Sequence, residues 1–254
     1  MPKVTGIPEA QAAFAIVLLT LSLLISPIKS AFANSLLDLV LAQRSQENAL
    51  FNTFEYRYHS FKSLPSWSSV LNRSKPEFST FLACANNKKK CKTSEQRAWH
   101  KFIISIRNKP RSQTIQAVNT HFNRWPYKTD NNVYGTDEYW ATLGQFIKNS
   151  GDCEDYAIAK YYTLKALGFK ENEIRIVALT NPTKEKGHVV LAIYGQGDIQ
   201  ILDNRSDLIL SHKEFSNYSP LYSINQTTHW VHRPKVPDVM NPTSKMWRQA
   251  LRDP

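Results

Sequence analysis

The order of apolar and polar residues predicts three helices in the middle of the chain. Residues 93–108 open with a hydroxyl cap and an early acid, and their apolar positions fall on one side of a helix that ends at Pro110. Apolar residues spaced three and four apart predict a second helix over 112–122. The third helix, 151–168, has Asp152 to cap its start, acids in its first turn and a glycine to stop it.

After the third helix the apolar period changes to two, which predicts short strands. The strands cover 174–180, 188–194 and 199–203, and a glycine-containing turn at 195–198 joins the last two. Short connections favour antiparallel pairing. The pattern therefore predicts an α+β fold in which a helical lobe packs its 151–168 helix on an antiparallel sheet.

The first 33 residues are typical of a cleavable secretory signal. Lys3 precedes an uncharged run over 12–25, and residues 31–33 have the small-x-small arrangement that signal peptidases cut. The run is shorter than the roughly 20 residues that a membrane-spanning helix needs. We expect cleavage before Asn34, export of the mature chain and no stable membrane anchor.

The mature chain divides into three segments by composition. Residues 34–92 are assigned loosely to helix and loop, and 93–230 form the expected core. Residues 231–254, rich in proline and charge, are expected to be a surface tail with one short helix near Met246.

The chain is basic, with a formal net charge of +11. Loss of two lysines and one glutamate with residues 1–33 lowers this to +10, which favours acidic partners or an anionic membrane surface. Apart from Lys88, Lys89 and Lys90, the basic residues are scattered, and there is no nucleic-acid-binding motif or basic stripe. A nucleic-acid partner is not expected.

Three cysteines in an exported chain leave one without a partner. Cys84 and Cys91 flank a polar loop short enough for a local disulfide, although the spacing does not settle whether the bond forms. Cys153 is then a free thiol. It is either functional or an inert buried residue.

Cys153 occupies the first turn of the 151–168 helix, where free backbone N–H groups and the helix dipole favour an anion. Its thiolate should therefore form more easily than that of a free cysteine. Asp152 and Glu154 would oppose this if they pointed at the sulfur. We expect them to point away from it.

His188 and Asp203 are the candidate partners of Cys153. His188 begins one strand and Asp203 ends the next, and a hairpin that pairs them has its centre inside the 195–198 turn. Asp203 could accept the second imidazole proton and fix the orientation of the ring. The three residues would supply a nucleophile, a base and a group that orients the base.

The acidic residues Asp152, Glu154 and Asp155 also suit a calcium ion, because calcium prefers oxygen ligands. Helix capping and dipole compensation explain the same residues without a metal. The sequence lacks the twelve-residue loop of an EF-hand. Further ligands would have to come from backbone carbonyls or from the loop at 130–137.

The block DEYWATLGQFIKNSGDCEDYAIAKYYTLKALGF (137–169), followed by GHVVLAI and ILDN, resembles the bacterial transglutaminase-like cysteine peptidases. Within them it resembles the periplasmic adhesin proteases of the LapG type, over residues 93–210. The resemblance implies a papain-like or transglutaminase-like core with a proteolytic triad of Cys153, His188 and Asp203. It also implies a calcium ion beside the nucleophile, with Asp152, Glu154 and Asp155 at the acidic positions of the motif.

The same resemblance implies a location, a substrate and a regulator. The enzyme would work in the periplasm and cut a large calcium-binding biofilm adhesin near its amino end, at a pair of alanines, which releases the adhesin from the cell surface. The periplasmic domain of an inner-membrane receptor for cyclic di-GMP would sequester it.

One part of the block departs from the family. Leu143 and Gln145 stand where members often carry proline and glutamate. Gln145 could help to bind an oxyanion, but the backbone N–H of Cys153 is the preferred donor.

The sequence thus predicts a periplasmic, calcium-dependent cysteine protease. A transglutaminase-type acyl transferase and a non-catalytic module that binds calcium or a partner remain the alternatives.

Overall fold

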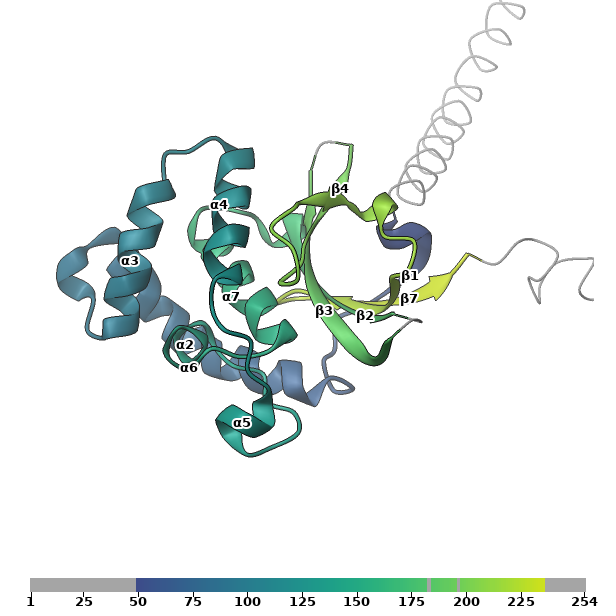
Figure 1. Ribbon diagram of the computed structural model, residues 1–254, viewed down its shortest axis with the longest axis horizontal. Helices are drawn as coiled ribbons and strands as arrows, with labels where there is room; N and C mark the ends of the chain where they lie inside the picture. Colours follow the sequence, from purple (N-terminus) through teal and green to yellow (C-terminus); the bar gives the residue numbers. More distant parts are fainter. Residues whose placement is uncertain (1–48, 182–183, 196, 236–254) are drawn as a thin grey trace, which may run out of the picture. The chain divides into compact units, whose positions relative to one another are not determined.

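The computed structural model describes residues 49–181, 184–195 and 197–235, and shows a curved sheet with helices packed on one of its faces (Figure 1). The expected signal at 1–33 and the short helix near Met246 lie outside these residues. Within the described residues, no helix is both long and apolar enough to cross a membrane.

Seven strands form one sheet, in the order β1-β7-β6-β2-β3-β4-β5, and every neighbouring pair is antiparallel. The strands are β1 (Thr53–Tyr58), β2 (Ile174–Asn181), β3 (Lys184–Tyr194), β4 (Ile199–Leu202), β5 (Leu210–Ser211), β6 (Ser219–Ile224) and β7 (His229–Pro234).

The helices precede all strands except β1. They are α2 (Pro65–Asn86), α3 (Ser94–Ile106), α4 (Arg111–Asn123), α5 (Asp130–Tyr134), α6 (Leu143–Asn149) and α7 (Cys153–Ala166). Short 3₁₀ turns complete the described elements: η1 (Leu50–Asn52), η2 (Lys88–Lys90), η3 (Glu171–Glu173) and η4 (His212–Glu214).

The three predicted helices are confirmed as α3, α4 and α7. Thr93 and Gln96 form a reciprocal capping box at the start of α3, which satisfies backbone donors there. At the start of α7, the Asp155 carboxylate accepts from the Asp152 N–H at 3.3 Å. After α7, Gly168 adopts φ +92°, a left-handed conformation that glycine accepts without strain.

Helix α7 is buried almost all round, because β2 and β3 lie on one side of it and α4, α6 and α2 on the other (Figure 1). Apolar residues of α7 and of the other helices join Val189, Leu191 and Ile193 in one core. A second, smaller core lies on the opposite face of the sheet and includes Val190 and Ala192. The first turn of α7 is therefore fixed against the sheet by packing on both sides.

The predicted strands are confirmed as β2, β3 and β4, but the register of the predicted hairpin was wrong by two residues. Leu191 pairs with Leu202 and Tyr194 with Ile199, so His188 and Asp203 are not directly opposite. A shift of two keeps both side chains on the same face, because side chains alternate with period two. Diagonal neighbours across strands remain within reach of long side chains.

Four strands, β1, β5, β6 and β7, were not predicted. β1 lies in the segment assigned to helix and loop, and β7 continues to Pro234, beyond the boundary at 230. Pro220 lies within β6, a residue that argues against a strand in a sequence. The polar loop expected near residue 130 contains the five-residue helix α5, which ends at Gly135 with φ +68°.

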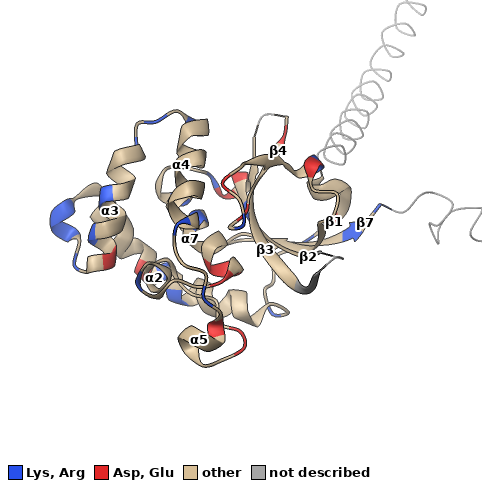
Figure 2. Ribbon diagram, viewed as in Figure 1, with Lys and Arg blue, Asp and Glu red and all other residues tan. Residues whose placement is uncertain are grey.

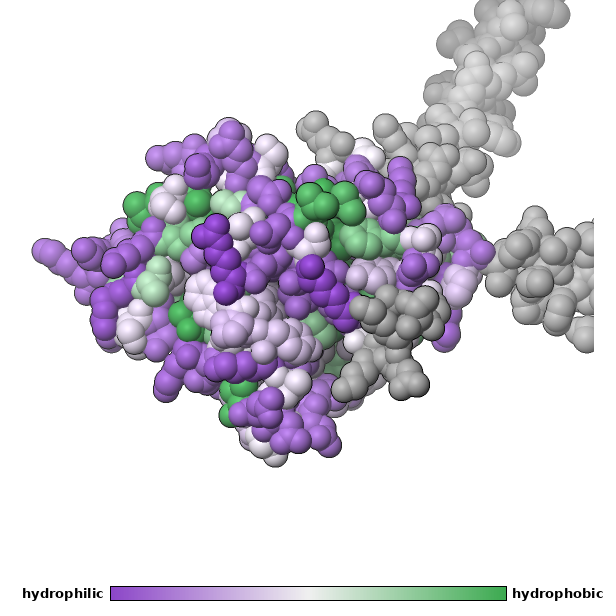
Figure 3. Space-filling view, viewed as in Figure 1, coloured by the Kyte–Doolittle hydropathy of each residue, from purple (hydrophilic) through white to green (hydrophobic). Residues whose placement is uncertain are grey.

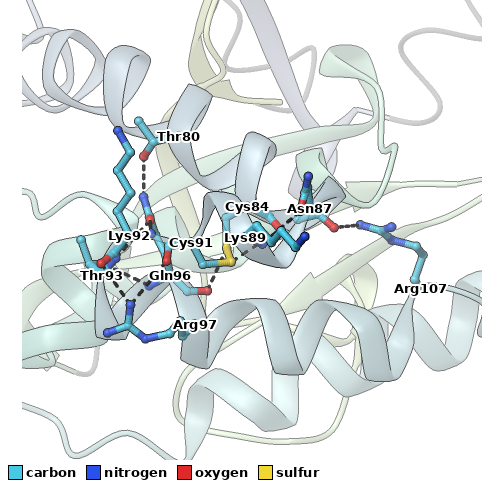
Figure 4. Close-up of a disulfide and its surroundings, with 11 residues drawn as sticks. Thr80, Cys84, Asn87, Lys89, Cys91, Lys92, Thr93, Gln96, Arg97 and Arg107 are labelled. Atoms are coloured by element: carbon cyan, nitrogen blue, oxygen red, sulfur yellow. Dashed lines mark hydrogen bonds between the residues drawn. A yellow bond between two sulfur atoms is a disulfide. The ribbon is translucent and has the colours of Figure 1, made fainter.

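Cys84 and Cys91 form a disulfide at the end of α2 (Figure 4). The loop that the bond closes contains the three exposed lysines of η2, and basic side chains gather at this end of the molecule (Figure 2). Gln96 links the loop to α3, because its side chain accepts from the Lys92 N–H. On the face drawn in Figure 3, hydrophilic residues predominate and apolar residues form small separate groups.

Removal of the disulfide should destabilise the protein by about 2 to 3 kcal/mol, the loop-closure entropy of a short ring. Urea unfolding of the Cys84→Ser/Cys91→Ser variant, with and without reductant, measures this. The wild type should lose stability in reductant, whereas the variant should not respond to it. Three titratable thiols in the denatured, unreduced wild type would contradict the bond.

Candidate active site

Cys153 is the one free cysteine among the described residues, and it is partly buried in the first turn of α7. Its thiol donates a hydrogen bond to Glu154 Oε2 at 3.2 Å. The Cys153 sulfur and one carboxylate oxygen from each of Asp152 and Glu154 all lie within 4.8 Å of one another. The expectation that the two acids point away from the sulfur was therefore wrong.

The pKa of the Cys153 thiol is raised above its ordinary value. Burial is the largest cause, and the charge and hydrogen bond of Glu154 add to it. The backbone N–H of Val189 faces the sulfur and acts in the opposite direction. With the thiol bonded to a carboxylate, the helix start does not activate the cysteine in the way expected from its position alone.

His188 and Asp203 are brought together, as predicted. His188 Nε2 lies 2.9 Å from Asp203 Oδ1, and both side chains are buried. Burial raises the pKa of Asp203, but the hydrogen bond and charge of His188 and the N–H of Arg205 outweigh it and lower that pKa to about 2. Asp203 is thus a carboxylate that accepts from the imidazole.

Among the described residues, the thiol of Cys153 and the imidazole of His188 are not hydrogen-bonded to each other. The sulfur faces the N–H of Val189, the residue after His188. His188 Nδ1 is buried and has no hydrogen-bond partner. Because Asp203 occupies Nε2, Nδ1 is the nitrogen that remains available for a thiol proton.

Gly151 allows the turn before α7 to close tightly. A Cβ on this residue would lie 2.0 Å from Asp155 Oδ2, so no larger residue fits without a shift of Asp155. Asp155 Oδ1 accepts from the Ala141 N–H at 2.6 Å and Oδ2 from the Asp152 N–H at 3.3 Å. Asp155 therefore ties the loop before α6 to the turn that carries Cys153.

A second group of carboxylates includes residues of the same turn. One oxygen from each of Asp130, Asp152 and Asp155 lies within 4.8 Å of the others. Burial is the main cause that raises the pKa of Asp130 to about 6 and of Asp152 to about 8. Figure 2 shows acidic residues near α5 and near the start of α7.

This carboxylate group fits a calcium ion, because Asp130 Oδ1 and Asp152 Oδ1 are both buried without a hydrogen-bond partner. The structure thus groups Asp152 and Asp155, two of the three predicted ligands, with Asp130. The carboxylate of the third, Glu154, is directed at the sulfur of Cys153. Asp130 came from the loop expected to supply further ligands, but its sequence position alone did not single it out.

Gln145 does not face the sulfur. Its side chain bonds to the Thr142 N–H at 3.0 Å, to the Tyr139 hydroxyl at 2.9 Å and to Arg73 at 2.6 Å. It serves as part of the capping box of α6. The structure therefore gives no support to Gln145 as an oxyanion donor.

Lys160 is a site residue that sequence reasoning missed. It is buried in α7, two turns after Cys153, and its Nζ donates to Asn119 Oδ1 at 2.8 Å. Asn119 Nδ2 in turn donates to the Ser206 carbonyl, and Asn123 Nδ2 to the Asp203 carbonyl at 3.0 Å. These polar side chains fix the position of the segment that follows β4. The only indication of them in the sequence was a lysine between apolar neighbours.

A scan against protein families matches residues 70–235 to the family described as bacterial transglutaminase-like cysteine proteinase (BTLCP). Among solved structures, LapG of Legionella pneumophila is 28% identical, with a TM-score of 0.52, and the match covers 69% of this chain and 96% of that one. The calcium-bound LapG matches with the same identity and score over 97% of its chain. An EGTA-treated LapG is 27% identical, with a TM-score of 0.52. A search of curated proteins finds no match.

The burial of Lys160 predicts a pH-dependent stability. Burial lowers its pKa from 10.5 to about 7 in the folded protein. Between these values the unfolded chain holds the extra proton, so the lysine costs most stability below pH 7 and less as the pH rises. Lys160→Met removes this dependence. The unfolding free energy of the variant minus that of the wild type should fall by about 2 to 3 kcal/mol between pH 7.5 and 9.5.

Urea unfolding at both pH values measures this difference. Lys101→Met, at an exposed position of α3, is the control and should give a pH-independent difference. A constant difference for Lys160→Met as well would contradict the shifted pKa.

Proposed function

Because the chain belongs to the bacterial transglutaminase-like cysteine proteinases, we propose that it is an endopeptidase that uses Cys153, His188 and Asp203 as its catalytic triad. The membership supports a cysteine peptidase. The residue roles rest on the His188–Asp203 hydrogen bond and on the position of the Cys153 sulfur beside the backbone N–H of Val189.

The observation that carries the proposal is the free nitrogen of His188. Asp203 holds Nε2 at 2.9 Å, and Nδ1 is left buried and unbonded on the residue next to Val189, whose N–H faces the sulfur. A buried nitrogen without a hydrogen-bond partner lowers the stability of the folded protein, so its presence suggests that a proton donor meets it during function. The thiol of Cys153 is the group with a proton to give.

The reaction begins when the thiol leaves Glu154 and passes its proton to His188 Nδ1. The sulfur attacks the peptide carbonyl, and the backbone N–H of Cys153 stabilises the oxyanion. His188 returns the proton to the leaving amine, which yields an acyl-enzyme. Water, deprotonated by His188, attacks the acyl-enzyme, and the imidazole then returns this proton to the Cys153 sulfur as the carboxylic acid product leaves. Asp203 keeps the ring oriented and stabilises its charged form.

The proposal includes calcium, held by Asp130, Asp152 and Asp155. Two orphaned buried oxygens in this group and the calcium-bound structure of LapG support it. When bound, the ion supplies positive charge that offsets the carboxylates around the start of α7. The residues themselves fix the turn: Asp155 ties it to Ala141, and Asp130 Oδ2 accepts from the Tyr139 N–H at 2.5 Å.

The resemblance to the LapG type extends the proposal to substrate, place and control. The substrate is a large secreted adhesin, cut near its amino end at a pair of alanines and released from the cell surface. The enzyme acts in the periplasm, and the periplasmic domain of an inner-membrane cyclic di-GMP receptor sequesters it. What supports these points is the family and the 28% identity to LapG.

A transglutaminase uses the same triad but lets an amine take the acyl group, and a binding module would not need Cys153 at all. Incubation of the protein with a recombinant adhesin fragment and a labelled amine distinguishes them. Cleavage without label is expected. Label incorporated into an uncut fragment would support the transglutaminase.

Replacement of the nucleophile tests the triad. Cys153→Ser should lower the rate of adhesin cleavage by at least about a thousandfold, because the serine hydroxyl is a far weaker nucleophile here than a thiol. Gel analysis of cleavage over time measures the rate. The variant should keep the melting temperature of the wild type. Undiminished cleavage would remove Cys153 from the mechanism and favour another site.

Chelation tests the metal. Calcium at 100 times its Kd should stabilise the wild type by about 2.7 kcal/mol over the chelated protein. Asp130→Asn should lose most of this stabilisation, because it removes one ligand charge. Asp137→Asn, an exposed acid three residues after α5, should keep it. Equal calcium responses in the wild type and both variants would place the ion elsewhere.

A further inference from the structure

Both oxygens of the Asp203 carboxylate are engaged, although only one of them serves His188. Oδ1 accepts from the imidazole and from the Arg205 N–H, each at 2.9 Å. Oδ2 accepts from the Tyr218 hydroxyl at 2.7 Å. The phenol therefore holds the oxygen that the imidazole leaves unused.

An aromatic cluster fixes the ring of Tyr218. Phe215 stacks on it with a centroid distance of 4.9 Å and an interplanar angle of 14°. Phe51 packs edge-on at 6.2 Å. The imidazole of His188 lies on another side of the phenol at 5.9 Å. The phenol ring therefore lies close to the proposed catalytic pair as well as to the aromatic rings of Phe51 and Phe215.

Phe51 reaches this cluster from the far end of the described chain. It lies in η1 with φ +50°, a conformation that non-glycine residues rarely adopt. Its N–H donates to His212 Nδ1 at 2.8 Å, which anchors the turn to η4. This hydrogen bond and the packing of the Phe51 ring hold the backbone of Phe51 in its unfavourable conformation.

We propose that Tyr218 is a positioning residue for the His188–Asp203 pair, and that Phe51 supports it from the amino-terminal turn. This inference rests on the proposed function.

The Tyr218 hydroxyl restricts rotation of the Asp203 carboxylate. A carboxylate held at one oxygen can turn about its Cβ–Cγ bond and exchange oxygens. A charge-assisted bond to the second oxygen sets the plane of the group. Oδ1 then stays directed at Nε2, and Nδ1 stays available to the thiol. The charged groups that face Tyr218 are Asp203 and Arg205, and Lys160 acts on Asp203 from α7.

Tyr218→Phe keeps the stacked ring and deletes only the hydroxyl. Cleavage of the adhesin fragment should show kcat about tenfold lower with KM unchanged, the loss expected for one hydrogen bond to a charged group. Tyr194→Phe is the matched control. Its hydroxyl is buried and has no hydrogen-bond partner, and its ring packs on Arg175. This control should keep the wild-type kcat.

Two further readouts separate positioning from general loss of structure. In an Asp203→Asn background, Tyr218→Phe should cause no additional loss, because it acts through that carboxylate. The low-field proton resonance of His188 Nε2–H should move upfield in Tyr218→Phe and stay in place in Tyr194→Phe. Phe51→Leu should give the same shift in part.

An unchanged His188 resonance, a kcat within twofold of the wild type or a fully additive loss with Asp203→Asn would each overturn the proposal. The resonance needs no substrate, so the positioning role is tested even where the fragment is not cut. Failure of the proposed function shows separately, as cleavage that persists in Cys153→Ser or as a wild type that cuts nothing.

Discussion

The burial of helix α7 between the sheet and the remaining helices is the constraint on which the site depends. Polar groups on a buried helix lose water, so each must find a partner within the protein. Asp155 meets two backbone N–H groups, Lys160 meets Asn119, and the thiol of Cys153 meets Glu154. The hydrogen bonds around the start of α7 all meet this one requirement, that each buried polar group has a partner.

The same burial gives the site its electrostatic character. Carboxylates of Asp130 and Asp152 lie close together and are partly withdrawn from water, which raises their pKa values. Asp203, by contrast, has a lowered pKa because it accepts three hydrogen bonds. The pKa values of the two acidic regions are thus shifted in opposite directions. The difference lies in the donors that each carboxylate finds.

Local signals in the sequence sufficed for α3, α4, α7 and the three central strands, because caps and apolar periods act within a few residues. The His188–Asp203 contact was also predictable, since it follows from one hairpin and survives a register shift of two. β1 and β7 were not predictable in this way. They are stable as strands only because they pair with each other across the length of the chain.

The directions of the side chains at the site were the features hardest to predict from the sequence. The turn of Glu154 toward the sulfur and the approach of Asp130 to Asp152 depend on how distant segments pack. Tyr218 gave no signal, because its partner Asp203 is remote from it in any local pattern. The resemblance to a family identified the chemistry of the motif, but not the residues that surround and support it.

The pairing of β1 with β7 has a consequence for how the protein is assembled. Thr53 lies opposite Pro234, so the edge of the sheet cannot close until nearly the whole described chain is present. Contacts this far apart form late, since the loop between them must first be ordered. The turn that carries Phe51 is continuous with β1. The site is therefore complete only after the last strand, β7, has been synthesised. A chain truncated before β7 would lack the support on which the imidazole of His188 relies.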